Sequence, residues 1–366
     1  MLSIINKTLM VSAGLLLSNV PCYSQQPSKN QTVFVINQEK MAIDNKTTTV
    51  FKITQANGEW GYRGVKGEMF DAIVKNNADV PTSVHWHGLI LPNNMDGVPL
   101  VTQAPIPPGG EFHYQFKLVQ AGTFWMHSHQ DFQIQQLLSA PFIIEEANQK
   151  IDEKEVTLFL ADFTYKSPET VFQNLRTSMN HTSHMEHMDM SKPDLNDVKY
   201  DVFLTNYHSL KKPEIIAVKP GDVVRLRIIA GSAMSNFFIN TGKLQGEAIA
   251  VDGNNIEPIS DHLFQLAVGQ RIDIRVRIPE GEGYYPILAQ GEGTNMQTGL
   301  ILATSKAKIQ VPPERVNETF GALNYQQEYR THALQNTPLA KPEQKIVISM
   351  QGDMSKYVWK INNEIW

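Results

Sequence analysis

The sequence contains 366 residues, of which 42% are hydrophobic and 19% charged, a composition typical of a globular chain of two or three domains. The net charge of −5 at pH 7 excludes the basic surface that nucleic-acid-binding proteins use. A single cysteine, Cys22, cannot build a disulfide framework, and no apolar run beyond the N-terminus is long enough to span a membrane.

Residues 1–24 have the pattern of an export signal. Lys7 supplies a positive charge, residues 9–17 form a short apolar stretch, and Cys22 and Ser24 are the small residues that precede a cleavage site. A buried N-terminal helix is the alternative interpretation. The pattern predicts a cleaved signal peptide and a periplasmic or secreted protein.

The rest of the chain has the sequence pattern of a β protein. Short β-rich runs recur, among them Val50–Ile53, Val156–Leu160 and Ile272–Val276, and turn-forming pairs such as Asn57-Gly58 separate them. Runs at this spacing predict β-sandwiches or barrels. No long stretch keeps a helical period, so we expect strands rather than helices.

A weak internal repeat predicts two related β domains. The motif Val-Lys-Gly-Glu at residue 65 and the motif Val-Lys-Pro-Gly-Asp at residue 218 each lead into a strand. Polar stretches mark the boundaries. We therefore divide the chain into domains at 32–148 and 154–305, a polar linker at 306–345, and the beginning of a further strand pattern at 346–366.

Two His-x-His motifs carry the strongest chemical signal. In a strand, residues i and i+2 point to the same face, so His85 with His87, and His127 with His129, each present two imidazoles side by side. Two such strands packed together place four imidazoles around one small space. Imidazole without carboxylate or thiolate suits copper, zinc, iron or nickel. Ordinary histidines are the alternative, but two motifs beside aromatic residues favour a metal site.

The segments around these motifs resemble the first half of a multicopper oxidase, in particular the bacterial copper-resistance oxidases and laccase-like enzymes. The resemblance is carried by Ser83–Gly88, Asp96–Pro99 and Gly122–His129, and in the second domain by Val251–Gly253 and Val268–Arg271. It implies an all-β fold of tandem cupredoxin-like Greek-key β-sandwich domains, with copper as the cofactor.

The resemblance also implies a role for each histidine. His85 would bind the type-2 copper, and His87, His127 and His129 would bind the type-3 pair. Asp96 matches an acidic position that relays protons for oxygen reduction. The alternative is that Asp96 is a turn residue.

The third domain of the family has no full counterpart in this sequence. Residues 346–366 resemble only the first strand of that domain, so we expect a third domain that is missing except for its first strand. A type-1 copper site needs a cysteine thiolate, and no cysteine follows Ser24. The two His-x-His motifs supply four of the eight imidazoles that the trinuclear cluster of the family needs.

The segment 179–190 is a second candidate for copper binding. Thioether sulfur selects Cu(I) and imidazole takes Cu(II). The polar interruptions predict a mobile loop with weak, labile copper binding, and the alternative is a solvated loop whose methionines are incidental. The candidate ligands are Met179, His181, His184, Met185, His187, Met188 and Met190.

Together these features predict a copper-binding protein of the multicopper oxidase family with a role in copper resistance. The enzymes of this family are oxidoreductases that reduce oxygen. The same features also predict that this chain alone is inactive, with oxygen and a reductant as partners only if the missing domain is supplied. A non-catalytic periplasmic protein that sequesters copper is the alternative. A structural relative without copper is a third possibility, against which the retained histidines argue.

Overall fold

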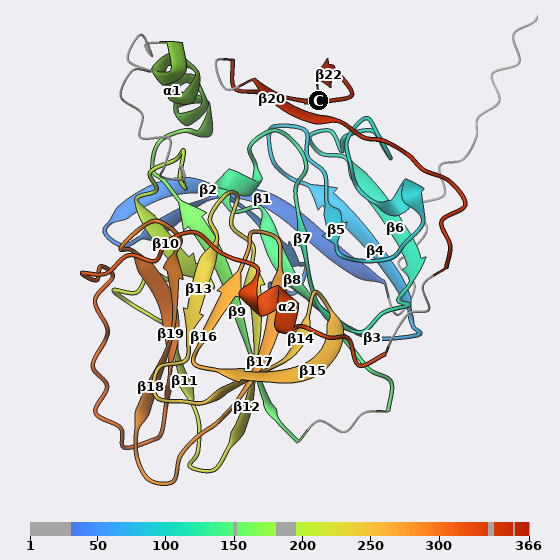
Figure 1. The fold of residues 1–366 in the computed structure, drawn as a ribbon. Helices are drawn as coiled ribbons and strands as arrows, with labels where there is room; N and C mark the ends of the chain where they lie inside the picture. Colours follow the sequence, from blue (N-terminus) through green and yellow to red (C-terminus); the bar gives the residue numbers. More distant parts are fainter. Residues whose placement is uncertain (1–30, 149–151, 181–194, 336–339, 354–355, 366) are drawn as a thin grey trace, which may run out of the picture.

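The computed structural model describes residues 31–148, 152–180, 195–335, 340–353 and 356–365. Within these ranges the chain forms two β-sandwiches, each built of two sheets, and a small three-stranded sheet (Figure 1). No helix in the described ranges has the length and the apolar character that crossing a membrane requires.

The first sandwich packs a sheet of order β2-β1-β4-β6 on a sheet of order β3-β8-β7-β5. In both sheets a parallel pair, β1 with β4 and β3 with β8, joins strands that are not consecutive in the chain. The elements are β1 (Thr32–Ile43), β2 (Lys46–Gln55), β3 (Tyr62–Val65), β4 (Met69–Asn76), β5 (His85–His87), the 3-10 helix η1 (Asn93–Met95), β6 (Glu111–Lys117), β7 (Gly122–His127), the 3-10 helix η2 (Ile134–Gln136) and β8 (Ser139–Glu145).

The core of the first sandwich is aromatic. Trp86 is fully buried and lies 4.9 Å from Phe70 and 5.6 Å from Phe142, measured between ring centroids. Aromatic pairs at these separations add about 0.5–1.5 kcal/mol each beyond the burial of their area. Trp86 is the middle residue of β5, so its burial turns His85 and His87 to the opposite face of the strand.

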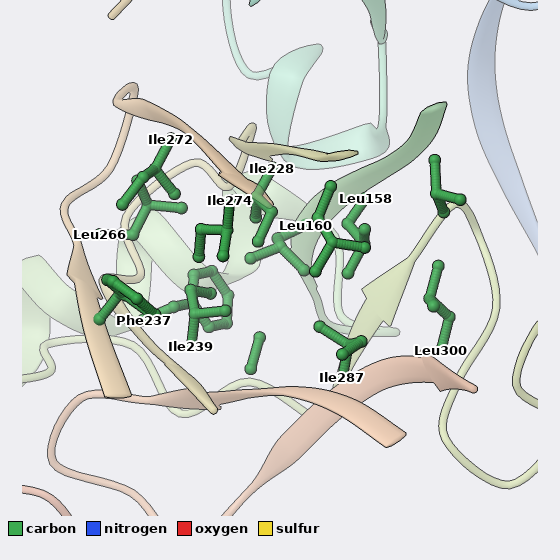
Figure 2. Packing of buried hydrophobic residues seen from close by; sticks show 14 of the residues in the cluster. Leu158, Leu160, Ile228, Phe237, Ile239, Leu266, Ile272, Ile274, Ile287 and Leu300 are labelled. Carbon is green, nitrogen blue, oxygen red and sulfur yellow. The ribbon is translucent and has the colours of Figure 1, made fainter. Parts of the chain in front are cut away.

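The second sandwich packs a sheet of order β10-β9-β12-β17-β14-β15 on a sheet of order β11-β19-β18-β13-β16. Side chains from both sheets meet in its core, where Ile228 and Ile274 face Phe237 and Ile287 (Figure 2). The strands are β9 (Lys154–Phe163), β10 (Val202–Thr205), β11 (Ile215–Ala217), β12 (Val223–Ala230), β13 (Phe237–Asn240), β14 (Gly246–Val251), β15 (Asn254–Asp261), β16 (Leu263–Leu266), β17 (Arg271–Arg277), β18 (Tyr284–Gly291) and β19 (Gln297–Ala303).

A helix that the sequence analysis did not expect follows β9. Helix α1 spans Pro168–Asn180, so residues 179 and 180, which we expected in a loop, instead end a helix. Ser167, the residue before the helix, caps its N-terminus, because its hydroxyl accepts a hydrogen bond from the amide of Thr170 at 3.2 Å. Val171 and Leu175, one turn apart, pack against the second core. This apolar stripe is too narrow to stand out in the sequence.

The C-terminal part also differs from the sequence expectation. Where we expected one strand, β20 (Met350–Asp353), β21 (Val358–Ile361) and β22 (Glu364–Ile365) form an antiparallel sheet. The preceding segment, which we expected to be a linker, contains the short helix α2 (Gln326–Arg330) and follows the second sandwich. The amide of Glu257, for example, donates to the carbonyl of His332 at 2.8 Å.

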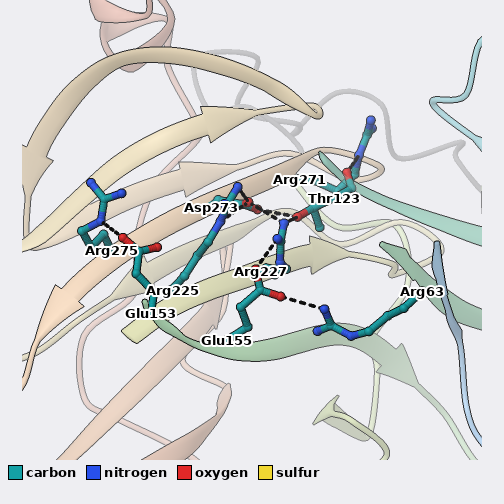
Figure 3. A network of polar contacts seen from close by, with 9 residues as sticks. All are labelled: Arg63, Thr123, Glu153, Glu155, Arg225, Arg227, Arg271, Asp273 and Arg275. Carbon is teal, nitrogen blue, oxygen red and sulfur yellow. Dashed lines mark hydrogen bonds and ion pairs between the residues drawn. The ribbon is translucent and has the colours of Figure 1, made fainter. Parts of the chain in front are cut away.

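A buried polar network joins the two sandwiches (Figure 3). The Thr123 hydroxyl on β7 donates to Asp273 on β17 at 2.6 Å and accepts from Arg227 on β12 at 3.0 Å. Arg227 also pairs with Glu155, which in turn pairs with Arg63 on β3 at 2.7 Å. Burial alone would raise the pKa of Glu155, but its contacts with Arg227 and Arg63 hold that pKa below its usual range. The sandwiches are therefore fixed to each other beside the strand that carries His127.

The network predicts a large effect for Arg227→Met. Arg227 is 1% exposed, and its removal leaves buried carboxylates with fewer partners. Removing one member of a buried ion pair costs about 3–5 kcal/mol, and we expect a loss of about 3 kcal/mol in the free energy of unfolding because Arg225 still pairs with Asp273. Chemical denaturation measures the loss. The matched control is Arg277→Met, at an exposed position on β17, and an equal loss in both variants would contradict a stabilising role for the network.

Candidate copper site

The two His-x-His motifs lie side by side on adjacent strands. β5 pairs antiparallel with β7, with His85 opposite His127 and His87 opposite Trp125. Because Trp86 and Met126 both point into the core, the imidazoles of His85 and His127 lie on the other face of the sheet. The register of two short strands thus brings the motifs together.

Three imidazoles form the centre of the site. The ligand nitrogens of His85, His87 and His127 all lie within 4.8 Å of one another. Nδ1 of His87 is 3.2 Å from Nε2 of His127. This set contains no carboxylate and no thiolate, and imidazole donors of this kind suit copper.

His129 lies beside this group just beyond the end of β7. Its ring centroid is 4.8 Å from that of His85 and 5.0 Å from that of His127, but the residue is exposed whereas His127 is buried. The structure therefore gathers all four predicted histidines around one space, with His129 on the solvent side.

Two of the imidazoles are held through Nδ1, which leaves Nε2 of each ring as the nitrogen available to a metal. Nδ1 of His85 lies 2.8 Å from the backbone oxygen of Asp96 and 3.2 Å from its carboxylate. Nδ1 of His127 lies 3.0 Å from the backbone oxygen of Ser128. Contacts of this kind orient metal-binding histidines and fix the tautomer. Asp96 also ends the 3-10 helix η1, so it is a turn residue and a partner of His85 at once.

The surroundings keep the imidazoles of His87, His127 and His129 uncharged. Burial, the charge of Arg271 and the neighbouring imidazoles lower the pKa of His87 to about 3. Burial lowers the pKa of His127 well below its usual value and also lowers that of His129. Only a neutral imidazole offers its lone pair to a metal, so these side chains are in the ligand form at neutral pH.

An indole that the sequence analysis did not single out supports the site. Trp125 is 2% exposed and stacks on His87 at 4.7 Å and on His127 at 4.2 Å, with an interplanar angle of 26° in both pairs. The ring thus forms a flat floor under two of the imidazoles. Its position next to the second motif was the only signal in the sequence.

Gln133 anchors the second motif and was also missed. Its side-chain oxygen accepts from Ser128 at 2.8 Å and from Thr82 at 2.7 Å, and its amide nitrogen donates to the carbonyl of Pro81 at 2.7 Å. These bonds tie the turn after β7 to the segment before β5. No sequence motif marks this glutamine, because its role depends on tertiary contacts alone.

The second candidate segment lies almost wholly outside the described residues. Met179 is in the last turn of helix α1. The ligands proposed from the sequence that lie outside the described residues are His181, His184, Met185, His187, Met188 and Met190.

The stacking predicts that Trp125→Ala destabilises the protein. Replacing a buried tryptophan by alanine costs about 3–5 kcal/mol, because apolar burial is lost and a cavity is left. Trp359, which is 56% exposed, provides the matched control. Denaturation curves of both variants measure the difference, and a loss of stability in Trp125→Ala no larger than that in Trp359→Ala would be inconsistent with the packing described.

Solved structures share this fold. A laccase from Botrytis aclada has a TM-score of 0.68 with 23% identity, over 91% of this chain and 63% of that protein. A multi-copper oxidase from Pseudomonas thermotolerans has a TM-score of 0.61 with 22% identity, over 86% and 68% of the two chains. The predicted fold class, tandem cupredoxin-like β-sandwiches in an all-β chain, is thereby confirmed.

Curated proteins of related sequence carry copper-related names. Copper resistance protein A of Pseudomonas syringae pv. tomato is 31% identical over 282 residues, which cover 69% of this chain and 46% of that protein. Multicopper oxidase MmcO of Mycobacterium tuberculosis is 28% identical over 372 residues, which cover 96% and 73%. The chain spans about half the length of the copper resistance proteins that it matches.

Two sequence profiles, both described as "Multicopper oxidase", match residues 36–149 and residues 154–308. Together they cover most of the chain, and they confirm the resemblance that the histidine motifs indicated. Members of this family bind copper, as the motifs predicted. The chain belongs to the multicopper oxidase family.

Proposed function

We propose that His85, His87, His127 and His129 bind copper and that the protein serves copper resistance as part of an oxygen-reducing oxidoreductase. The convergence of the four imidazoles on one space carries this proposal. The names of the copper resistance proteins support the biological role. Bound copper would supply the electron-transfer chemistry by which such enzymes reduce oxygen, and the protein would hold the metal with imidazole donors that hydrogen bonds orient.

The four histidines have distinct roles in this proposal. Following the family resemblance, His85 binds the type-2 copper and His87, His127 and His129 contribute to the type-3 pair. Asp96 holds Nδ1 of His85 through its backbone and its carboxylate, so it orients this ligand. The carboxylate is 31% exposed and lies between solvent and His85, which supports a role in proton relay.

We propose further that the described chain does not catalyse turnover on its own. Its only cysteine is Cys22, in the predicted signal, so the chain offers no thiolate for a type-1 copper beyond Ser24. Four motif histidines are half of the trinuclear ligand set of the family. The other ligands would have to come from polypeptide outside this chain, and oxygen and a reductant would be partners only if that polypeptide is supplied.

The domain limits and the location of the protein are part of the same proposal. The matched ranges support domains at 32–148 and 154–305, and residues 346–366 would begin a third. The signal pattern of residues 1–24 supports export to the periplasm or beyond.

A copper-sequestering protein without turnover is the second candidate. The Met/His segment 179–190 favours it, because soft thioethers and imidazoles would hold copper in addition to the four-histidine site. The two candidates share the site and differ in whether oxygen is consumed once the remaining ligands are supplied by further polypeptide.

Copper loading followed by oxygen uptake tests the proposal. We expect the full chain to bind copper, to lose part of it in His85→Ala and His127→Ala, and to show neither intense blue colour nor oxidase turnover on Cu(I) or phenols. Oxygen consumption at about 10 per second, a typical enzyme rate, that disappears in His127→Ala would show that the chain is catalytically complete.

The contact with His85 predicts that Asp96→Asn weakens copper binding. Loss of a hydrogen-bonding partner of a metal ligand typically costs 10–100-fold in affinity, and we expect about 10-fold because the backbone oxygen of Asp96 remains. Asp79→Asn, at an exposed position in the same sandwich, is the control. Competition against a copper chelator measures the copper affinity of both variants. Equal affinities would show that the Asp96 carboxylate does not contribute to copper binding.

A further inference from the structure

A turn of the second sandwich reaches the copper site of the first. We propose that the turn Val268–Arg271 forms a wall of this site, with Gly269 and Arg271 as positioning residues for His87. The inference rests on the proposed copper site.

Gly269 lies directly against the imidazole of His87. A Cβ atom added at Gly269 would be 3.1 Å from Cε1 and 3.4 Å from Nε2 of His87. The backbone there has φ +79°, in the left-handed region that favours glycine. The turn therefore touches the ring edge between its two nitrogens, and any side chain at Gly269 would push the ring.

Arg271 holds this turn against the first sandwich. Its Nη1 donates to the carbonyl of Gly269 at 3.0 Å, and its Nε donates to the carbonyl of Thr123 on β7 at 3.1 Å. Nη1 also lies 3.1 Å from the carboxylate of Asp252. The guanidinium is almost fully buried, so it links the turn, Asp252 and the strand that carries His127 through bonds that water does not screen.

The residue after His87 makes room for the same arginine. A Cβ atom at Gly88 would lie 2.3 Å from Nη2 of Arg271, and the backbone has φ +87°. The second sandwich thus shapes both the ring of His87 and the backbone that follows it.

His87 depends on this wall more than its neighbours do. Nδ1 of His85 and Nδ1 of His127 are each held by a backbone oxygen of the first sandwich, whereas Nδ1 of His87 faces Nε2 of His127. The orientation of His87 is therefore set by Trp125, which stacks on the face of the ring, and by the turn at Gly269, which meets the ring at Cε1 and Nε2.

The test compares Gly269→Ala with Gly281→Ala in the full chain. Gly281 has φ +91° and open space around its Cβ, so its variant reproduces the backbone strain without a contact. Copper affinity is measured by competition titration, with His87→Ala defining the part that depends on His87. We expect Gly269→Ala to weaken this part at least 10-fold and Gly281→Ala to leave it within about twofold.

A second readout needs no copper. In the metal-free protein, the imidazole nitrogen resonances of His87 should shift in Gly269→Ala and stay in place in Gly281→Ala. Arg271→Lys keeps the charge but loses the fork that bonds both carbonyls, so it should also move the His87 signals and weaken copper binding. If Gly269→Ala fails to fold, Arg271→Lys tests whether the turn positions His87.

Unmoved His87 resonances in folded Gly269→Ala, or in Arg271→Lys, would refute the proposal that the turn Val268–Arg271 positions His87. Equal copper binding by the unmodified chain and His87→Ala would instead refute the proposed copper function. In that case the His87 resonances of the metal-free variants still decide whether the turn positions the ring.

Discussion

The burial of Trp86 is the constraint on which the site depends. Trp86 is the central residue of a three-residue strand and is enclosed by the aromatic core of the first sandwich. Because side chains alternate across a strand, this one anchor fixes His85 and His87 on the outer face. Met126, opposite Trp86 on β7, does the same for His127. A strand slipped by one residue would bury the imidazoles and expose the indole.

The seam between the sandwiches is the second determinant of the geometry. Polar groups are buried there and nearly all are paired, among them Thr123, Arg227 and Asp273. Such a network loses stability when one member is removed, and it specifies a single arrangement of the two units. β7 carries both Thr123 and His127. The position of the second sandwich, which bonds to Thr123, therefore affects the position of His127 through a short stretch of chain.

The sequence was sufficient to predict the features that follow local rules. Alternating strands, the two His-x-His motifs and their shared face all depend on the period of two, and the structure shows four imidazoles together. Helix α1 was missed because the apolar stripe that packs on the core reduces to Val171 and Leu175. Gln133, Trp125 and Gly269 were missed as parts of the site because their partners are distant in the chain or come from another strand, and no local pattern encodes such contacts.

The two sandwiches contribute differently to the metal site. The first supplies all four imidazoles, while the second packs against His87 and bonds to the strand that carries His127. This explains in physical terms why the second sandwich bears on the metal site without offering a ligand among the described residues. The metal centre is then a property of the pair of sandwiches, and a variant at the seam can alter it without touching a histidine.

The most direct measurement is anomalous diffraction at the copper absorption edge from crystals of the copper-loaded chain. The account predicts copper density within bonding distance of the imidazole nitrogens of His85, His87 and His127, with His129 at its solvent side. Well-occupied copper elsewhere, with these four imidazoles free of metal, would contradict the central claim.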